Sequence, residues 1–420
     1  MSGAAAIGRA KRVLVISQTY VPDPAAVGQQ IADLTFELAR RGHDVRVYTA
    51  NRGYEDTNRV YPPRETLHGV DVRRLAMSSF GKRSIATRVL GTASFLVQAF
   101  FLCLFTPNLA GIFFSTSPPL IGFAASLARV VRRVPIIYWA MDLNPDQLIA
   151  MGKIKPTGII ARGLEAVNRF ILKRSNLVVA LDRYMADRLR ARGVSDAKLL
   201  VMPPWPHEEH IQVSSGGSSG ENPFRARHGL NGKFVIMYSG NHSPANPLQT
   251  LLDAAVRFKD DDSLRFLFVG GGGGKKAVES YVREHGLRNA LLLPYQPLEE
   301  LKHSLSAADV HVVSLGTDMV GIIHPCKVYG AMAIARPFLY LGPPRSHITD
   351  LLDRYAIGWK VSHGDVDGAA AAIEAMRRMP REELSRMGTD AAQVLEGSLS
   401  QSLLCGRLAD AVEATFHLKR

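Results

Sequence analysis

Short apolar runs rich in β-branched residues alternate with longer helical patterns along almost the whole chain, and this alternation limits the possible fold more than any other feature. A helical face over 27–41 follows the first such run, and glycine ends it. Alternating β and α segments indicate a parallel, doubly wound sheet that binds ligands at the carboxyl ends of its strands. In the first half the predicted strands are Arg12–Ser17, His43–Thr49, Val70–Leu75, Gly111–Ser115, Pro135–Trp139 and Asn176–Ala180.

The alternation stops at a proline-rich stretch, Pro203–Pro206, followed by the Gly/Ser-rich segment Ser214–Gly220, and then starts again. Two Rossmann-like domains facing across a cleft are therefore expected, and a cleft is a usual place for a small ligand. The later predicted strands are Phe234–Ser239, Leu264–Val269, Ala290–Leu293, Val310–Ser314, Pro337–Leu341 and Trp359–Val361. We expect a first domain over 1–210, a linker over 211–229, a second domain over 230–395, and a last helix over 396–420 that packs back on the first domain.

Nearly all the excess positive charge lies in the first half. The 420 residues carry a formal charge of +13, and residues 1–210 hold 28 Lys and Arg against 16 Asp and Glu, a net charge of +12. Such asymmetry points to an anionic partner such as nucleic acid, anionic lipid or a phosphorylated substrate, or it is merely a solvated basic surface. The motifs of nucleic-acid-binding folds are absent from the sequence, so no nucleic-acid partner is expected.

Metal and hydrolase chemistry are not indicated. Three scattered cysteines are too few for a disulfide framework or a cysteine-rich zinc site, and they suggest a reducing compartment. The histidines lack HExxH-type spacing, no GxSxG motif occurs, and 260–262 (DDD) is typical of a surface loop. We expect no metal and no cofactor. With no recognisable signal peptide, we expect a cytoplasmic protein.

The longest apolar stretch, Val89–Phe105, is at the lower limit for a membrane-spanning helix. A buried or membrane-facing helix is the preferred interpretation, with Phe95, Leu96, Phe100, Phe101 and Phe105 available for an apolar face. Peripheral binding of the first domain to anionic bilayers is therefore predicted, and the alternative is a helix packed wholly inside the domain among solvated basic residues. The flanking basic residues are Arg73, Arg74, Lys82, Arg83, Arg88, Arg129, Arg132 and Arg133.

The glycine run Gly270–Gly274 follows a predicted strand, but it fits neither common phosphate-binding motif. Lys275 occupies the last glycine position of GxGxxG, and Lys276 stands where a P-loop has Ser or Thr. The remaining alternatives are a turn that lets a ligand approach the backbone closely and a plain flexible turn.

Five segments at strand ends or helix starts carry the informative residues. They are Ser17–Gln30, Tyr138–Asp146, Tyr238–Pro247, Leu293–Asp309 and Gly321–Pro337. With ELARRGHDVRVYTA (37–50), SGN (239–241), LPYQP…AADV (293–310) and PCKVYGAMAIARP (325–337), the chain resembles the GT-B glycosyltransferases of family 4 over nearly its whole length. The resemblance is to the bacterial branch that builds capsule, colanic acid, O-antigen and other exopolysaccharides. It implies retaining transfer from a nucleotide-sugar donor, without a metal, to a saccharide or polyprenyl-linked acceptor.

The resemblance also implies roles for individual residues. Asp142 would face the acceptor or the reacting sugar from the first domain, and Lys327 would pair with a donor phosphate near a helix start. These two would be the catalytic residues, with Lys327 also binding the donor. The remaining implied donor-binding residues are Gly28, Gly240, Asn241, His242 and Gly270 near the phosphates, Tyr295 with Gln296 near the base, and Val328 beside Lys327.

The sequence departs from the pattern of many family members in four respects. Where many members have an Arg and Lys pair after the second-domain glycine, this loop has Asn241, His242 and Asn246. Gly330 stands in place of the second of two glutamates, Ile322 lies near the first, and Met141 replaces a histidine before the aspartate. Two alternatives therefore stay open: another GT-B enzyme such as a nucleotide-sugar 2-epimerase, and a non-catalytic subunit of a polysaccharide assembly.

Overall fold

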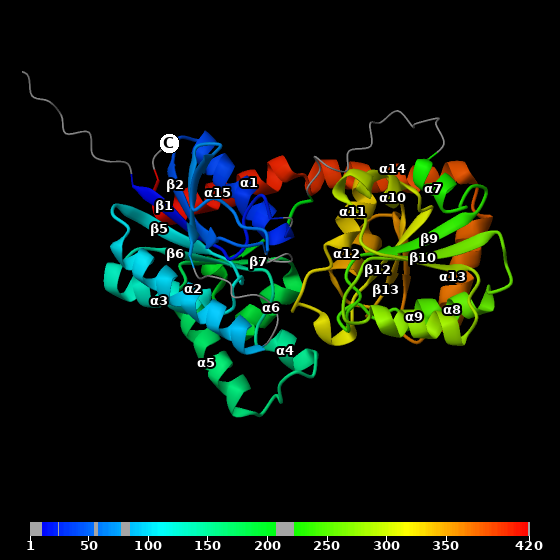
Figure 1. The fold of residues 1–420 in the computed structure, drawn as a ribbon, viewed down its shortest axis with the longest axis horizontal. Coiled ribbons are helices and arrows are strands. Elements are labelled where there is room, and N and C mark those ends of the chain that lie inside the picture. Colours follow the sequence, from blue (N-terminus) through cyan, green and yellow to red (C-terminus); the bar gives the residue numbers. More distant parts are fainter. Residues whose placement is uncertain (1–10, 24, 54–57, 77–84, 207–221, 419–420) are drawn as a thin grey trace, which may run out of the picture. The chain divides into compact units, whose positions relative to one another are not determined.

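The computed structural model describes the chain except residues 1–10, 24, 54–57, 77–84, 207–221 and 419–420 (Figure 1). The chain forms two compact units. Unit 1 comprises residues 1–204 and 402–420, and unit 2 comprises residues 205–401. Each unit has its own sheet of mostly parallel strands with helices packed on it, so each is described by itself.

The sheet of unit 1 has eight strands in the order β3-β4-β2-β1-β5-β6-β7-β8. All neighbouring pairs are parallel except β3 with β4. Its central strands are buried on both faces, which matches their continuous apolar sequences. The bounds are β1 Arg12–Ile16, β2 Asp44–Ala50, β3 Arg64–Leu67, β4 Val70–Leu75, β5 Leu109–Phe114, β6 Ile136–Ala140, β7 Leu177–Ala180 and β8 Leu199–Val201.

The antiparallel strand β3 is joined to β4 by a two-residue turn. His68 and Gly69 both have positive φ, of 47° and 83°. Positive φ at both central residues is the requirement of a tight type I′ hairpin turn, whose twist matches that of the flanking strands. Histidine is enriched among the few non-glycine residues at positive φ, but His-Gly is not one of the dipeptides that commonly signal this turn.

Helices cover the sheet of unit 1, and the last helix of the chain belongs to this unit. Helix α15 reaches it through two ion pairs of Arg41, at 2.7 Å to Asp410 and 3.1 Å to Glu413. Gly111 in β5 leaves room for the ring of Phe416, which a Cβ there would overlap. The helices are α1 Ala26–Arg40, α2 Ile85–Phe105, α3 Ile121–Arg132, α4 Asp146–Ala150, α5 Ile159–Arg174, α6 Arg183–Ala191 and α15 Gln401–Phe416, with a short 3-10 turn at Asp196–Lys198.

Unit 2 is built on a six-stranded, wholly parallel sheet in the order β11-β10-β9-β12-β13-β14. Its core lies between the sheet and α8, α9 and α13 on one side, with a smaller apolar cluster around Phe224 on the other. The strands are β9 Phe234–Ser239, β10 Leu264–Val269, β11 Ala290–Leu293, β12 Val310–Ser314, β13 Phe338–Leu341 and β14 Gly358–Val361. The helices are α7 Pro223–Arg227, α8 Gln249–Arg257, α9 Lys275–Glu284, α10 Leu301–Ser306, α11 Lys327–Ala333, α12 His347–Arg354, α13 Val366–Arg378 and α14 Arg381–Ser398.

The predicted alternation of strands and helices is confirmed, and all twelve predicted strands are present within two residues of their expected ends. The short edge strands β3 and β8 were not predicted, because their polar or three-residue sequences carry no strand pattern. Of the predicted linker over 211–229, residues 211–221 lie outside the described residues, and Pro223–Arg227 forms helix α7.

Helix α2 is apolar on two faces. One face is buried through Phe95, Ala99 and Cys103, all 0% exposed, and α2 packs against α3. The opposite face leaves Val97 57%, Phe101 50% and Phe105 76% exposed. No helix in the described part of the chain is long and apolar enough to cross a membrane.

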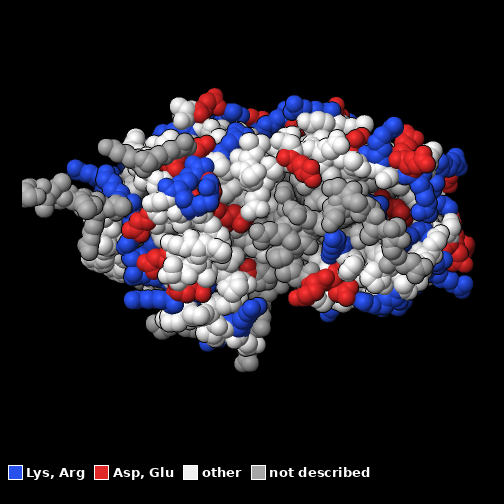
Figure 2. Space-filling view, turned by 90° about the horizontal axis from the view of Figure 1, so that it is seen from above, with Lys and Arg blue, Asp and Glu red and all other residues white. Residues whose placement is uncertain are grey.

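Many basic residues of the first half are already engaged. Arg73 forms an ion pair with Asp71, and Arg74, only 6% exposed, pairs with Glu65. Arg132 donates to the carbonyl groups at the end of α2. Figure 2 shows Lys and Arg side chains interspersed with Asp and Glu over the described part of one face. Lys82 and Arg83 lie outside the described residues, as does the side chain of Arg88.

Candidate active site

Two glycine-containing loops pack against each other at the carboxyl ends of β9 and β10. Gly240 and Gly270 both have positive φ, of 141° and 126°. A Cβ at Gly270 would overlap the Gly240 carbonyl oxygen, and a Cβ at Gly272 would overlap the Asn241 side chain. The backbone nitrogen of His242 donates to the Gly271 carbonyl at 2.7 Å. The glycine run is therefore a packed turn that supports the 240–242 loop, and not a slack connection.

Lys327, the first residue of α11, reaches this loop. Its ammonium donates to the Tyr238 hydroxyl, lies 3.4 Å from the Asn241 carbonyl oxygen and sits 4.3 Å from the centre of the Tyr238 ring. The Tyr238 hydroxyl in turn donates to the Asn241 carbonyl at 2.7 Å. A Cβ at Gly240 would overlap the Lys327 side chain. Glycine at position 240 thus makes room for the lysine.

Burial gives Lys327 an unusual charge state. Desolvation lowers the pKa of its ammonium to about 7, so the proton is loosely held. No carboxylate pairs with this lysine among the described residues. A phosphate anion brought next to Lys327 would raise its pKa again and hold it charged. The arrangement is therefore suited to binding an anion at neutral pH.

His242 and Asn241 differ in what they can offer a ligand. The His242 ring is 1% exposed, its Nδ1 lies 3.1 Å from the Gly240 carbonyl oxygen, and burial lowers its pKa. Its Nε2 has no hydrogen-bond partner among the described atoms. Asn241 is exposed beside it. The imidazole is thus a neutral, interior part of the loop, and Asn241 is its accessible residue.

The remaining sequence-predicted residues of unit 2 are partly brought together here. Tyr295 is 55% exposed, and a Cβ on Gly271 would lie 3.0 Å from its ring, so it borders the glycine loop. Gln296 is half-buried, and its amide donates to the Pro294 carbonyl at 2.9 Å. Val328 is 0% exposed, so its side chain belongs to the core and only its backbone is available.

Sequence reasoning missed several polar residues near this loop. Tyr329 links two histidines: its hydroxyl lies 2.7 Å from His324 Nε2 and 3.1 Å from His347 Nε2. This chain of contacts ties the start of α12 to α11, the helix that carries Lys327. Tyr238 begins one of the five informative segments, but it was not predicted as a site residue, because a tyrosine inside an apolar strand is usually a core residue. No sequence spacing relates 238 to 327, so only the folded sheet pairs them.

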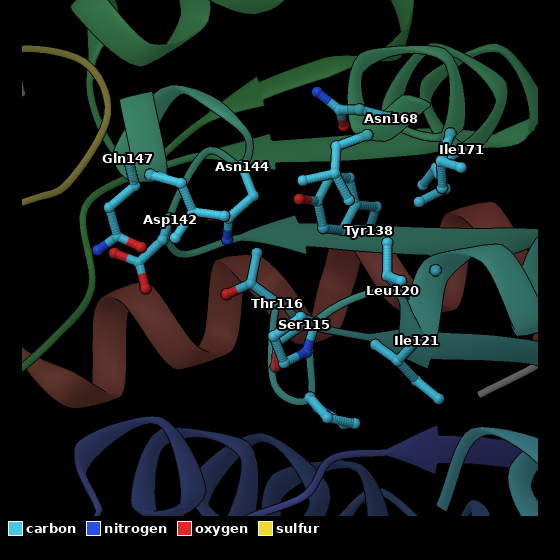
Figure 3. Close-up of a pocket in the computed structure, with 16 residues that line it drawn as sticks. Ser115, Thr116, Leu120, Ile121, Tyr138, Asp142, Asn144, Gln147, Asn168 and Ile171 are labelled. Atoms are coloured by element: carbon cyan, nitrogen blue, oxygen red, sulfur yellow. The ribbon is translucent and has the colours of Figure 1, made fainter. Parts of the chain in front are cut away.

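The other sequence-predicted catalytic residue, Asp142, lies in unit 1 just after β6. It borders a pocket of about 210 Å³ at the carboxyl ends of β5 and β6, closed by α3, α4 and α5. In Figure 3, Asp142, Asn144 and Gln147 gather at one end of this pocket. Tyr138 stands in the middle. The rest of the labelled wall is formed by Ser115, Thr116, Leu120, Ile121, Asn168 and Ile171.

Asp142 makes no hydrogen bond or ion pair with a described residue. Desolvation raises the pKa of its carboxyl to about 6, because the surrounding wall supplies neither a cation nor a donor to its carboxylate. Perturbed carboxylates in pockets are typical of functional sites. Such a group can accept a proton or a hydroxyl hydrogen bond near neutral pH.

Gly28, also in unit 1, lies in the first turn of α1 and is buried. A Cβ at this position would come within 3.0 Å of the Thr19 and Tyr20 backbone. Its local effect is to let α1 pack closely on the loop after β1. Within the described residues, no group of three or more His, Cys, Asp or Glu side chains is placed to hold a metal ion.

Comparison with known proteins gives matches in both units. The model of the glycosyl transferase 4-like domain matches residues 25–205, and that of glycosyl transferases group 1 matches residues 221–394. The putative colanic acid biosynthesis glycosyl transferase WcaI of Escherichia coli K12 is 24% identical over 387 residues, which cover 88% of this chain and 93% of that protein.

Solved structures share the architecture at low identity. Sucrose-phosphate synthase from Thermosynechococcus elongatus superposes with a TM-score of 0.74 at 14% identity, over 97% of this chain and 100% of that one. Anabaena HepE in complex with UDP and glucose gives a TM-score of 0.72 at 14% identity, over 96% of this chain and 100% of that one. At such identity these neighbours speak for the fold alone.

Proposed function

Because this chain belongs to the GT-B glycosyltransferases, with a glycosyl transferase 4-like domain followed by a group 1 domain, we propose that it moves a sugar from a nucleotide-sugar donor to a saccharide acceptor. The reaction proceeds with retention of configuration and without a metal. The likeness to the colanic acid biosynthesis glycosyl transferase supports a place in cell-surface polysaccharide biosynthesis. The donor binds unit 2, and the acceptor binds unit 1.

The observation that carries the donor assignment is the position of Lys327 over Tyr238, beside the Gly240-Asn241 loop. A nucleoside diphosphate would supply the anion that this half-buried lysine lacks. The HepE structure, a neighbour in fold, contains UDP and glucose, which supports the same ligand class here.

In the proposed reaction the protein contributes positioning and charge. The bond between the anomeric carbon and the leaving phosphate oxygen breaks while the acceptor hydroxyl attacks from the same face, and the leaving phosphate takes up the hydroxyl proton. Charge develops on the diphosphate as it leaves, and Lys327 stabilises that charge. Asp142 orients the acceptor hydroxyl from unit 1.

The acceptor is lipid-linked, and unit 1 contacts an anionic membrane peripherally on its cytoplasmic face. Support comes from the apolar strip on α2 formed by Val97, Phe101 and Phe105, and from Val130 and Val131 of α3, 48% and 66% exposed. Exposed apolar side chains gathered on adjacent helices are typical of interaction surfaces. The net charge of the first half adds attraction to anionic lipid.

Hydrolysis and binding of nucleotide-sugars test the proposal. A panel of UDP-, GDP-, ADP- and dTDP-sugars is screened by thermal shift, and a donor at 100 times its dissociation constant stabilises the protein by about 2.7 kcal/mol. The stabilising donor is then incubated with the protein, and release of nucleoside diphosphate is followed with and without saccharide acceptors. Release by the wild type but not by Lys327→Ala supports the proposal. Binding without any release would instead support a non-catalytic subunit, and conversion to a 2-epimeric sugar would support an epimerase.

A further inference from the structure

The pocket beside Asp142 is mostly aliphatic and has no cationic residue in its wall. Apart from Asp142 and Tyr138, none of its lining residues can ionise, and none is cationic. Most of its wall is aliphatic, from Leu120, Ile121 and the residues of α5 that face it. Its volume is about 210 Å³.

One buried amide in this wall is unpaired. Asn168 is 6% exposed, and its Nδ2 has no hydrogen-bond partner in the described structure. It stands on the face of α5 that carries Leu164, Val167 and Ile171, all lining the same pocket. A buried amide without a hydrogen-bond partner is destabilising, so an asparagine at this position lowers the stability of the fold. A ligand that enters the pocket can supply the missing partner.

These features discriminate among the groups that an acceptor could offer. A phosphate would meet no cation and would be repelled by Asp142. A hydrocarbon chain would leave the Asn168 amide unpaired, and a bare hydroxyl group would make no apolar contact with the aliphatic wall. An acylamino group suits both the aliphatic wall and the Asn168 amide. Its methyl group packs on aliphatic carbons, and its carbonyl and N–H can form hydrogen bonds with an amide.

We propose that this pocket seats an acylamino substituent of the acceptor sugar, with its amide bonded to Asn168, its methyl against the aliphatic wall and the sugar ring toward Asp142. The proposal rests on the assignment of the acceptor to unit 1. Asn168 is then a specificity-determining residue that reads one substituent. Any phosphate of a lipid-linked acceptor lies outside this pocket.

The test measures binding directly, without turnover. Methyl glycosides of glucose, N-acetylglucosamine, galactose and N-acetylgalactosamine are titrated into the full-length protein by ligand-observed NMR. The acetamido sugar of at least one pair binds about tenfold more tightly than its hydroxyl counterpart, with the strongest saturation transfer on the acetyl methyl. Equal affinities within both pairs overturn the proposal, as does saturation spread evenly over the sugar ring.

Two variants and one control assign the effect to the pocket. Asn168→Leu loses most of the acetamido preference, about tenfold, while its melting temperature is equal to or above that of the wild type, because an unpaired buried amide has been removed. Leu164→Trp fills the pocket and abolishes the preference by volume alone. Arg162→Ala, an exposed change on the same helix, leaves the preference intact.

The outcomes separate this proposal from the function on which it rests. A marked fall in melting temperature for Asn168→Leu, with the preference intact in Leu164→Trp, would make Asn168 a structural residue and refute the proposal. An acetamido preference in a protein that neither binds nor hydrolyses any nucleotide-sugar would refute the transferase function and leave the pocket assignment standing. Donor hydrolysis without any acetamido preference would support the transferase function and refute the pocket assignment.

Discussion

The ammonium of Lys327 lies 4.3 Å from the centre of the Tyr238 ring and donates to the hydroxyl of that tyrosine. The two residues are 89 positions apart in the chain. The contact joins the start of α11 to the end of β9, and the ring face attracts the cation without neutralising it. The charge therefore remains available to an incoming anion.

Replacing Lys327 by alanine is expected to reduce donor turnover by about 10²–10³-fold, because charge on the leaving diphosphate loses its counterpart. Tyr238→Phe keeps the ring and removes the hydroxyl, so it should have a smaller effect of the same kind. Steady-state assays of both variants check this. Wild-type turnover in Lys327→Ala would remove the lysine from the mechanism.

Replacing Lys327 by methionine is expected to stabilise the protein in a pH-dependent manner. The folded-state pKa is about 7 against a usual 10.5, so between these values the unfolded chain binds the proton that the folded chain has released. Wild-type stability should therefore rise with pH across this window relative to the methionine variant. The gain from methionine is largest below pH 7 and vanishes above pH 10.5. Urea unfolding at pH 6, 8 and 10 measures the difference, and a gain independent of pH contradicts the lowered pKa.

Asp142→Asn is expected to lower turnover while leaving nucleoside diphosphate affinity within about twofold, since unit 2 carries the donor contacts. The wild type should lose activity as pH falls through about 6, where the carboxylate becomes protonated. Calorimetry with the diphosphate and a pH–rate profile test both statements. A large loss of nucleotide affinity would place Asp142 on the donor side.

Gly270→Ala is expected to weaken nucleotide binding by at least tenfold and to destabilise unit 2, because the added Cβ overlaps the Gly240 carbonyl at a residue with φ of 126°. Gly273→Ala is the matched control in the same run, since a Cβ there meets no atom within 4 Å. Nucleotide calorimetry and melting temperatures compare the two. Equal effects of both substitutions would mean that the run is a plain flexible turn.

Val97→Glu combined with Phe101→Glu is expected to abolish flotation of the protein with anionic vesicles. Both side chains are at least half exposed on α2, and a buried glutamate at the headgroup boundary is costly. Val60→Glu, at a valine that is 59% exposed outside α2 and α3, serves as the control. Wild-type binding should weaken at high salt. Failure of the wild type to float with anionic vesicles would leave the apolar strip without its proposed partner.

The fold could be predicted from the sequence because the pattern that marks a strand or a helix lies within consecutive residues. Runs such as Phe234–Ser239 and Leu264–Val269 are mostly apolar over a full strand length, so burial on both faces can be predicted from the residues themselves. The same locality explains the misses. Strand β8 has three residues, and β3 depends on the positive φ of His68, which no pattern encodes.

The candidate site likewise has features that local sequence patterns predict and features that they do not. From the sequence alone, Lys327, Asp142 and the glycine loops could be placed at strand ends and helix starts, because chain order decides which end of a parallel sheet each loop occupies. Only the tertiary structure decided the rest: that Tyr238 faces Lys327, that His242 turns inward, and that the Asn168 amide stands unpaired in an aliphatic wall. These depend on packing between residues far apart in the chain, where side-chain direction and desolvation, and not residue type, set the chemistry.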